Sequence, residues 1–468
     1  MLRDVNINLS DGALASAVSA VGIHAKIGAS PVTASEAIVI RSSMSARRIR
    51  ELLGLSPLAD AVMDSIENGA NLVYCIPAVA STAGIPSSVT AVAQGSGTVA
   101  VSGSPHNAYR IQIKVTIPGG LNEAAVRVSL DGGSTWNEEQ TVPSNGSLAV
   151  ENTGLTLTFT AGEDGFAPGD LFSFTTTAPA MTNDDVLQAL DMVRGIHDVI
   201  EFVHIVGSSE PSLWSACAAV AATYHSTYKK PLFLVMEAEP PASRQNTDDY
   251  VTSLVSQRRG VESIYLQVVT ARGNYRRMDG TTQEINLAGL ICGLYARASV
   301  QQSIGETRSF AISDEKLLSL TPEGIEAETE TLDAAGYLTL RRYEGLSGWY
   351  VTNARLLCPD GSDYQYAERI RVTNKICREV RARLLTQLQR YVDISNLDRE
   401  LSAIGEMAMI PLDDMIAAGE ISSARVVVPE GQDILTSETL ELVIRYVPVG
   451  HVREIRVDLG MENPYAAN

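Results

Sequence analysis

The stretches IEFVHIVG (residues 200–207), PLFLVMEA (231–238) and SIYLQVVT (263–270) decide the fold of this chain. Each is a short apolar run rich in β-branched or aromatic residues, which is typical of a buried strand. Between them, residues 212–230 and 247–260 carry patterns typical of helices. Strands that alternate with helices form parallel sheets covered by helices, so this region predicts an α/β layer with a largely parallel sheet.

A second part of the same layer is expected upstream, in SPLADAVMDSIENGANLVYCIPA (residues 56–78). Ala61, Val62 and Ile66 recur at helical spacing, and Gly69 is a helix stop signal. The apolar run that follows predicts a strand. The chain is therefore expected to return to the α/β layer on both sides of a long interruption.

That interruption, residues 85–180, has a different composition. Gly, Ser, Thr and Val dominate, short alternating runs such as YRIQIKVTI recur, and turn formers such as Asp131-Gly132-Gly133 separate them. No helical period is present, so the segment predicts an all-β module of the Ig-like sandwich type. Its Ser/Thr/Gly-rich edges indicate linkers, and we expect an inserted domain.

Both ends of the chain alternate strictly between apolar and polar residues. Near the start, Val5, Ile7 and Leu9 fall on one face of an extended strand, and near the end the same holds for Ile455, Val457 and Leu459. Such strands have one apolar face and a row of backbone hydrogen-bonding groups. They need a sheet to join, either in their own domain or in a neighbouring subunit, and we expect them to be inter-subunit arms.

Composition limits the class of protein. With 468 residues, 45% apolar and 19% charged, the chain is expected to hold several folded domains. The mean hydropathy is +0.04, and no apolar run reaches the roughly 18 residues of a membrane span, so membrane insertion is not expected. The N-terminus lacks a signal-peptide pattern, which predicts synthesis in the cytoplasm. A net charge of -19 disfavours nucleic-acid partners.

The residues that usually carry chemistry form no recognisable site. The sequence lacks GxxxxGK[ST], GxGxxG after a strand, HExxH, zinc spacings and a GxSxG elbow. The five cysteines are scattered singly and are expected to be buried thiols. His204, inside an apolar strand, is expected to be a hydrogen-bonded core or interface residue. We therefore assign no catalytic, cofactor-binding or metal site and do not expect an enzyme.

One stretch differs from the acidic remainder of the chain. A long helix is expected from about Tyr366 to Tyr391, and residues 366–392 have a local net charge of +5. One interpretation is a solvated amphipathic helix; another is a surface that docks an acidic protein partner. The candidate docking side chains are Arg371, Lys375, Arg378, Arg381 and Arg383.

Together these segments resemble one family, the sheath proteins of contractile phage tails and phage-tail-like injection systems. The resemblance is carried by residues 56–78, by LAGLICGLYARAS (287–299) and by residues 349–385, where a strand with an Asn-x-Arg core precedes a long basic helix. VRVSLDGGSTW (126–136) and residues 154–179 resemble the β-insertion of some sheath proteins. The sequence that usually follows the G-x-Y-A-R run is altered here.

The resemblance implies a function without catalysis. Six subunits would form a ring, rings would stack into a sleeve around an inner tube, and contraction would drive the tube through a cell envelope. The partners would be further copies, the tube, the baseplate and the tail terminator, and the arms would add strands to neighbouring subunits. The basic helix would contact the tube.

The same resemblance divides this α/β and α+β multidomain chain into five parts. They are an N-terminal arm (1–20), an α/β core (21–84 and 181–350), the inserted β-sandwich (85–180), a C-terminal domain (351–450) and a C-terminal arm (451–468). Two alternatives stay open at this point: another phage or bacterial surface protein, such as a baseplate component or adhesin, and an α/β hydrolase or transferase with an accessory β-domain.

Overall fold

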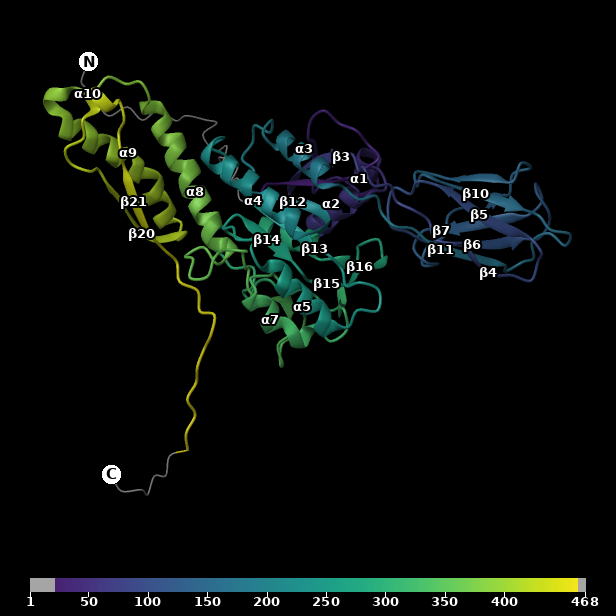
Figure 1. The fold of residues 1–468 in the computed structure, drawn as a ribbon. Helices are drawn as coiled ribbons and strands as arrows, with labels where there is room; N and C mark the ends of the chain where they lie inside the picture. The colour runs from purple at the N-terminus through teal and green to yellow at the C-terminus, as the bar shows by residue number, and fades with distance from the viewer. Residues whose placement is uncertain (1–21, 462–468) are drawn as a thin grey trace, which may run out of the picture. The chain divides into compact units, whose positions relative to one another are not determined.

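The fold is known from a computed structural model that describes residues 22–461 (Figure 1). Helices and several sheets occur throughout, so the chain is a mixed α/β protein. It divides into two compact units, one up to Lys375 and one from Ile376 onward. Helix α8 (Ala367–Leu384) begins in the first unit and ends in the second.

A six-stranded sheet forms the centre of the first unit, in the order β14-β13-β12-β1-β3-β2. Its strands are β1 (His24–Ala29), β2 (Ile38–Arg41), β3 (Leu72–Ala78), β12 (Phe202–Ser209), β13 (Phe233–Ala238) and β14 (Leu266–Val269). All neighbouring pairs are parallel except β2 and β3. The parallel pairing expected for β12, β13 and β14 is confirmed.

Strand β1 lies between β12 and β3, and sequence analysis did not identify it. Its six residues are all buried. The run HAKIGA contains His24 and Lys26, however, and charged or polar residues are almost never fully buried unless they have partners. Lys26 has its partner, His204, on another strand, so the sequence of β1 alone does not have the apolar pattern of a central strand.

Helices cover the sheet and leave few positions of these strands exposed. They are α1 (Ala46–Leu53), α2 (Pro57–Glu67), α3 (Asn183–Val193), α4 (Pro211–Ser226), α5 (Thr247–Arg258) and α6 (Ala288–Arg297). Helices α2 and α6 approach closely, because a Cβ on Gly293 would lie 2.6 Å from the Ser65 carbonyl oxygen. The Ser65 hydroxyl donates to the Gly289 carbonyl across the same contact, at 2.6 Å.

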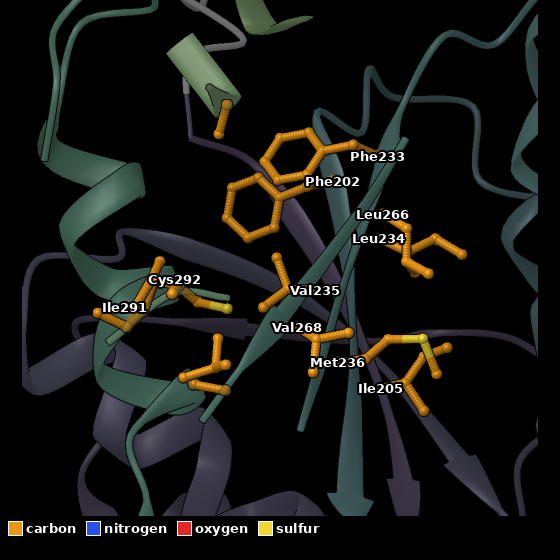
Figure 2. Close-up of a cluster of buried hydrophobic side chains, with 14 of the residues drawn as sticks. Phe202, Ile205, Phe233, Leu234, Val235, Met236, Leu266, Val268, Ile291 and Cys292 are labelled. Atoms are coloured by element: carbon orange, nitrogen blue, oxygen red, sulfur yellow. The ribbon is translucent and has the colours of Figure 1, made fainter. Parts of the chain in front are cut away.

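The core explains why the strand sequences are nearly continuous apolar runs. Figure 2 shows side chains of β12, β13 and β14 packed together, with Ile291 and Cys292 of α6 facing the strands. The rings of Phe202 and Phe233 lie side by side with centroids 5.3 Å apart. A sheet buried on both faces selects apolar residues at successive positions.

Residues 90–175 form two antiparallel sheets, in the orders β5-β10-β9 and β4-β11-β6-β7-β8. The strands are β4 (Thr90–Val92), β5 (Thr98–Gly103), β6 (Arg110–Ile117), β7 (Ala125–Ser129), β8 (Gln140–Thr141), β9 (Ser147–Val150), β10 (Leu155–Thr160) and β11 (Leu171–Thr175). They enclose their own hydrophobic cluster, in which Phe159, Phe166 and Phe172 make edge contacts. We call residues 85–180 the insert.

The remainder of the first unit adds two small sheets and two short helices. Their elements are β15 (Arg272–Arg276), β16 (Thr282–Asn286), β17 (Leu317–Thr321), η1 (Ile325–Glu328), α7 (Thr329–Ala334), β18 (Leu340–Arg341) and β19 (Tyr350–Val351). β15 lies between β16 and β17, and β18 pairs with β19.

The second unit contains the end of α8 followed by a helix and a β-hairpin. Its elements are η2 (Leu385–Gln387), η3 (Ile394–Asn396), α9 (Leu397–Ala417), β20 (Ile421–Val427), α10 (Ile434–Ser437) and β21 (Val443–Pro448). Across the two units, none of the helices within residues 22–461 is long and apolar enough to cross a membrane.

The expected helix to Tyr391 is wrong at its C-terminal end, because α8 stops at Leu384. The chain then turns, and Gln389 has a positive φ of 61°. Leu388 and Tyr391 are 70% and 91% exposed, so residues 22–461 provide little packing to hold them in a further helical turn. Helices in proteins depend mainly on such packing for their stability.

Candidate assembly surfaces

The hairpin of β20 and β21 is a two-stranded antiparallel sheet, and no other strand of the described chain joins it. One side of it is covered, because β20 packs along α9 and a Cβ on Gly405 would lie 2.8 Å from the Val428 side chain. An isolated two-stranded sheet is marginally stable in water. Its edges are the kind of surface to which a strand of another chain adds.

The stretch after this hairpin is extended and exposes its apolar side chains. Figure 1 draws residues 451–461 without a strand arrow. Ile455 and Val457 are each 79% exposed and Leu459 is 92% exposed. Single exposed apolar residues are ordinary, but an alternating row of them is a surface suited to a partner. The first arm, with Val5, Ile7 and Leu9, lies outside the described residues.

Arg371 differs from its sequence-based assignment as a docking residue, because it is fully buried. Its guanidinium forms a bidentate ion pair with Glu201, which is also fully buried, through Nε–Oε1 at 2.6 Å and Nη2–Oε2 at 3.2 Å. A side chain without exposed surface cannot contact a separate tube. Arg371 is therefore a residue of the subunit interior.

The surroundings of Arg371 explain its burial. Its Nη2 also donates to the carbonyl oxygens of Tyr295 and Ala298, at 3.0 and 3.1 Å, where α6 ends. Helix C-termini leave carbonyl groups without intrahelical partners and carry partial negative charge, so a cation there is favourable. Glu201 in turn accepts from the Gly22 amide at 2.7 Å. Arg371 thus positions the start of α8 against α6 and β12.

The other basic residues of α8 have different environments. Lys375 and Arg378 are partly buried, whereas Arg381 and Arg383 are exposed in the last turn. Cations in a last turn stabilise a helix through its dipole, which accounts for part of the charge pattern. The exposed pair also leaves a positive surface on a chain whose net charge is -19.

A chain of polar groups crosses three strands of the central sheet. Lys26 Nζ lies 2.6 Å from His204 Nδ1, and His204 Nε2 lies 3.0 Å from a Glu237 carboxylate oxygen. Burial, and next the nearby Lys26 charge, lower the pKa of His204 well below 6.5, so the ring is neutral. Lys26 then donates to Nδ1, and Nε2–H donates to Glu237, whose pKa burial raises to about 7.

These contacts confirm the interpretation of His204 as a hydrogen-bonded core residue. The cysteine prediction also agrees, since Cys75, Cys217, Cys292 and Cys358 are buried thiols and Cys377 is half-buried. Among the residues that the structure describes, no three His, Cys, Asp or Glu side chains gather as metal ligands would.

Comparison of the sequence with protein families gives two adjoining matches. Residues 2–355 match the DUF2586 N-terminal domain, and residues 363–466 match the DUF2586 C-terminal domain. No curated protein matches the chain.

Solved structures with a similar fold are sheath proteins. The contracted helical sheath of the anti-feeding prophage is 11% identical, with 99% of both chains covered and a TM-score of 0.54. The contracted sheath of the extracellular contractile injection system called PVC is 12% identical, with 99% of this chain and 98% of the other covered and a TM-score of 0.53.

A sheath tail protein from Desulfitobacterium hafniense is 14% identical, with 95% of this chain and 100% of the other covered and a TM-score of 0.50. At these identities the likeness establishes the fold. The chain belongs to the DUF2586 family, and its fold is that of contractile tail sheath proteins.

Proposed function

We propose that this chain is the sheath subunit of a contractile tail or tail-like injection system. It polymerises as stacked hexameric rings around an inner tube and contracts to drive the tube through a target cell envelope. Its likeness to two sheaths in their contracted state, over nearly the whole of each chain, supports this function.

The observation that carries the proposal is a pair of incomplete surfaces in the second unit. One is the two-stranded sheet of β20 and β21, and the other is the extended segment 451–460 with its exposed apolar row. Among residues 22–461, no further strand joins the hairpin, and the segment 451–460 joins no sheet. A head-to-tail exchange is a heterologous contact, and where such contacts do not close into a ring they build an open filament.

The arms are therefore proposed as the connectors of the sleeve. Residues 2–10 and 451–460 pair with sheets of neighbouring subunits, through the faces of Val5, Ile7 and Leu9 and of Ile455, Val457 and Leu459. Backbone hydrogen bonds in such a ladder hold subunits together while the segments flanking the strands bend. Subunits then rotate and slide during contraction without separating.

The basic surface of α8 is proposed to contact the tube. Lys375, Arg378, Arg381 and Arg383 carry this role, and Arg371 instead holds the helix on its own subunit. Exposed ion pairs each contribute little, typically below about 1 kcal/mol, but a sleeve repeats them over many subunits. An acidic tube surface would complement them.

The remaining parts of the chain are assigned to domains in the same way. Residues 21–84 and 181–350 form the α/β core, residues 351–450 the C-terminal domain, and residues 1–20 and 451–468 the arms. The insert is an Ig-like sandwich on the outer surface of the sheath. Its two sheets with their own hydrophobic cluster support an independently folded domain.

Baseplate and tail terminator proteins are the partners at the two ends of the sleeve. The subunit is made in the cytoplasm of a bacterial host and ends in a virion tail or a tail-like particle. No catalysis is proposed, because contraction releases free energy stored in a metastable extended lattice.

Electron microscopy of the purified protein, alone and with the tube protein of the same particle, tests this function. Hollow sleeves with six-fold symmetry are the expected result. Discrete closed particles with no tendency to stack would instead indicate a baseplate component, and a monomer that never assembles with any tail protein would overturn the proposal.

A further inference from the structure

The insert joins the core through two segments that run beside each other, rather than through loose linkers. Thr82 and Ala180 exchange both backbone hydrogen bonds, at 3.2 and 2.9 Å. Further along, the Thr177 amide donates to the Ile85 carbonyl at 3.0 Å, and the Ser87 amide donates to the Thr175 carbonyl at 2.8 Å. We call this paired ribbon, residues 81–88 and 175–180, the stalk.

The stalk is held at its core end and enclosed midway along its length. At the core end, Ser81 donates from its amide and its hydroxyl to the Asp185 carboxylate, at 2.9 and 2.7 Å, in the first turn of α3. Midway, Gly84 is tightly enclosed, because a Cβ there would lie 2.4 Å from the Thr177 carbonyl oxygen and 2.9 Å from that of Pro105. A ribbon of this kind restricts bending far more than two separate linkers of Ser, Thr and Gly would.

A second set of contacts joins the insert to the core beside the stalk. Asn107 Nδ2 donates to an Asp60 carboxylate oxygen of α2 at 2.8 Å, and the Tyr109 hydroxyl donates to the Leu55 carbonyl at 3.2 Å. Arg110 Nη2 donates to the Thr282 carbonyl of β16 at 2.6 Å. We call these contacts the dock.

The dock has an apolar part as well as a polar part. Leu55, in the turn between α1 and α2, packs against the hydrophobic cluster of the insert. The dock is also tied to the stalk, because Thr176 Oγ1 accepts from the Tyr109 amide and donates to the Asn107 carbonyl, both at 2.8 Å. Movement of the insert about the stalk would break both sets of contacts together.

Asp60 takes part in the dock and also lies close to charged side chains of the core. It lies 3.6 Å from Arg277, which forms a bidentate ion pair with Asp64 at 2.7 and 3.0 Å. These groups line an open cavity of about 530 Å³ at the dock, together with Glu237. A partly buried carboxylate is stabilised by hydrogen-bond donors, so Asp60 favours the position of Asn107 that supplies one.

We infer that the dock and the stalk together hold the insert in one fixed orientation on the core, so that it moves as a rigid part of the subunit. Each contact is individually weak. The stalk keeps the partners close, however, and an intramolecular contact at high effective concentration stays formed. In any assembly of this chain, the distal loops of the insert would then form an ordered array. The inference concerns the single subunit and stands apart from the proposed sheath function.

Hydrogen exchange of the full-length protein, measured by mass spectrometry on stalk peptides, tests the inference. The double substitution Asn107→Ala and Arg110→Ala removes two dock contacts. Its matched control, Asn137→Ala with Arg127→Ala, removes the same residue types from exposed positions of the insert. The free energy of local opening rises with the stability of the contacts that enclose an amide, so weaker contacts give faster exchange. We expect stalk amides to exchange at least tenfold faster in the dock variant and within twofold of wild type in the control.

Two further measurements keep the test decisive. Exchange in β12 and β6 shows that the core and the insert remain folded. Tyr109→Phe, which keeps the buried ring and removes only its hydroxyl bond, should give a smaller increase in the same stalk peptides. Stalk amides that exchange in wild type like those of an unstructured peptide, or a dock variant that behaves like its control, would overturn the inference.

Discussion

At the scale of single residues, the arginine side chains of α8 have two different environments, one buried and one exposed. Arg371 shares a face of α8 with Ala367, Ile370 and Asn374, all of which are buried at helical spacing. Its helical spacing from these buried residues is the sequence feature that distinguishes Arg371 from Arg381 and Arg383. A count of charges along the helix, which led to its assignment as a docking residue, does not use this information.

Replacing Arg371 by Ala should strongly lower the free energy of unfolding of the subunit. The change removes the bidentate cationic partner of the buried Glu201 carboxylate, and removing one partner of a buried ion pair costs about 3–5 kcal/mol. Chemical denaturation of the purified subunit measures the loss. Arg383→Ala, on the exposed part of the same helix, should change the free energy of unfolding by no more than about 0.5 kcal/mol. Equal effects of the two substitutions would contradict the buried pair.

Glu237 should make stability depend on pH in a defined direction. Burial raises its pKa from 4.5 to about 7, so it binds a proton more tightly in the folded chain than in the unfolded one. The contribution of Glu237 to the free energy of unfolding is fully present below the unfolded pKa of 4.5, and it is lost as pH rises through about 7. The difference in unfolding free energy between wild type and Glu237→Gln should therefore fall by on the order of 3 kcal/mol across that range.

Comparing wild type with Glu237→Gln separates the effect of Glu237 titration on stability from the effects of other groups that titrate nearby. His204 and His24 have pKa values lowered by burial, so their contribution to stability changes in the opposite sense, falling as pH drops. Both histidines are present in the two proteins being compared. A difference that stays constant from pH 5 to about pH 8 would show that Glu237 does not titrate there.

At the scale of elements, sequence patterns succeeded where an element is a continuous apolar run or has apolar residues at helical spacing. The strands β12, β13 and β14 and the helix α2 lie where their patterns place them. β1 was missed because Lys26 finds its partner His204 on another strand, and no local pattern contains that pairing. The end of α8 was misplaced because nothing at Leu384 resembles a stop signal. Long-range contacts, absent from a local pattern, decide both cases.

The C-terminal arm should fail as a connector when it cannot form a ladder. Ile455→Pro removes one backbone donor and restricts the chain within residues 451–460, so we expect folded subunits or rings that do not extend into long sleeves. Sleeve length in electron micrographs is the measurement. Ile455→Val keeps a β-branched residue and should build sleeves of normal length. Normal sleeves from the Pro variant would mean that other contacts connect the subunits.

The basic end of α8 should govern attachment to the tube. Reversing Arg378, Arg381 and Arg383 to Glu changes the local charge from attractive to repulsive toward an acidic tube, so sheaths should assemble without tube. Co-sedimentation of tube protein with sheath measures this. Arg47→Glu with Arg48→Glu on α1, two further exposed basic positions, controls for charge reversal itself. Tube recovered equally with both variants would exclude the assignment.

At the scale of the whole molecule, the insert interrupts the core at one place. Its two connections are neighbours, because Thr82 and Ala180 pair directly, and beyond them the chain continues from β3 and into α3. The core sheet takes no strand from the insert, and the two hydrophobic clusters are separate. The core therefore has all of its own contacts without the insert, apart from those of the dock and the stalk.

Deleting residues 83–179 should consequently leave assembly intact. Thr82 and Ala180 are close enough for a short Gly-Ser turn to join them without strain on β3 or α3, and the insert is proposed to face away from the tube. Leu55 loses its apolar partner in this variant, so it should also be changed to Ser to prevent aggregation through the exposed patch. Sleeves that are thinner but of normal length in electron micrographs are the expected result. A soluble, folded deletion variant that no longer polymerises would show that the insert lies between subunits, and its outer position would then have to be abandoned.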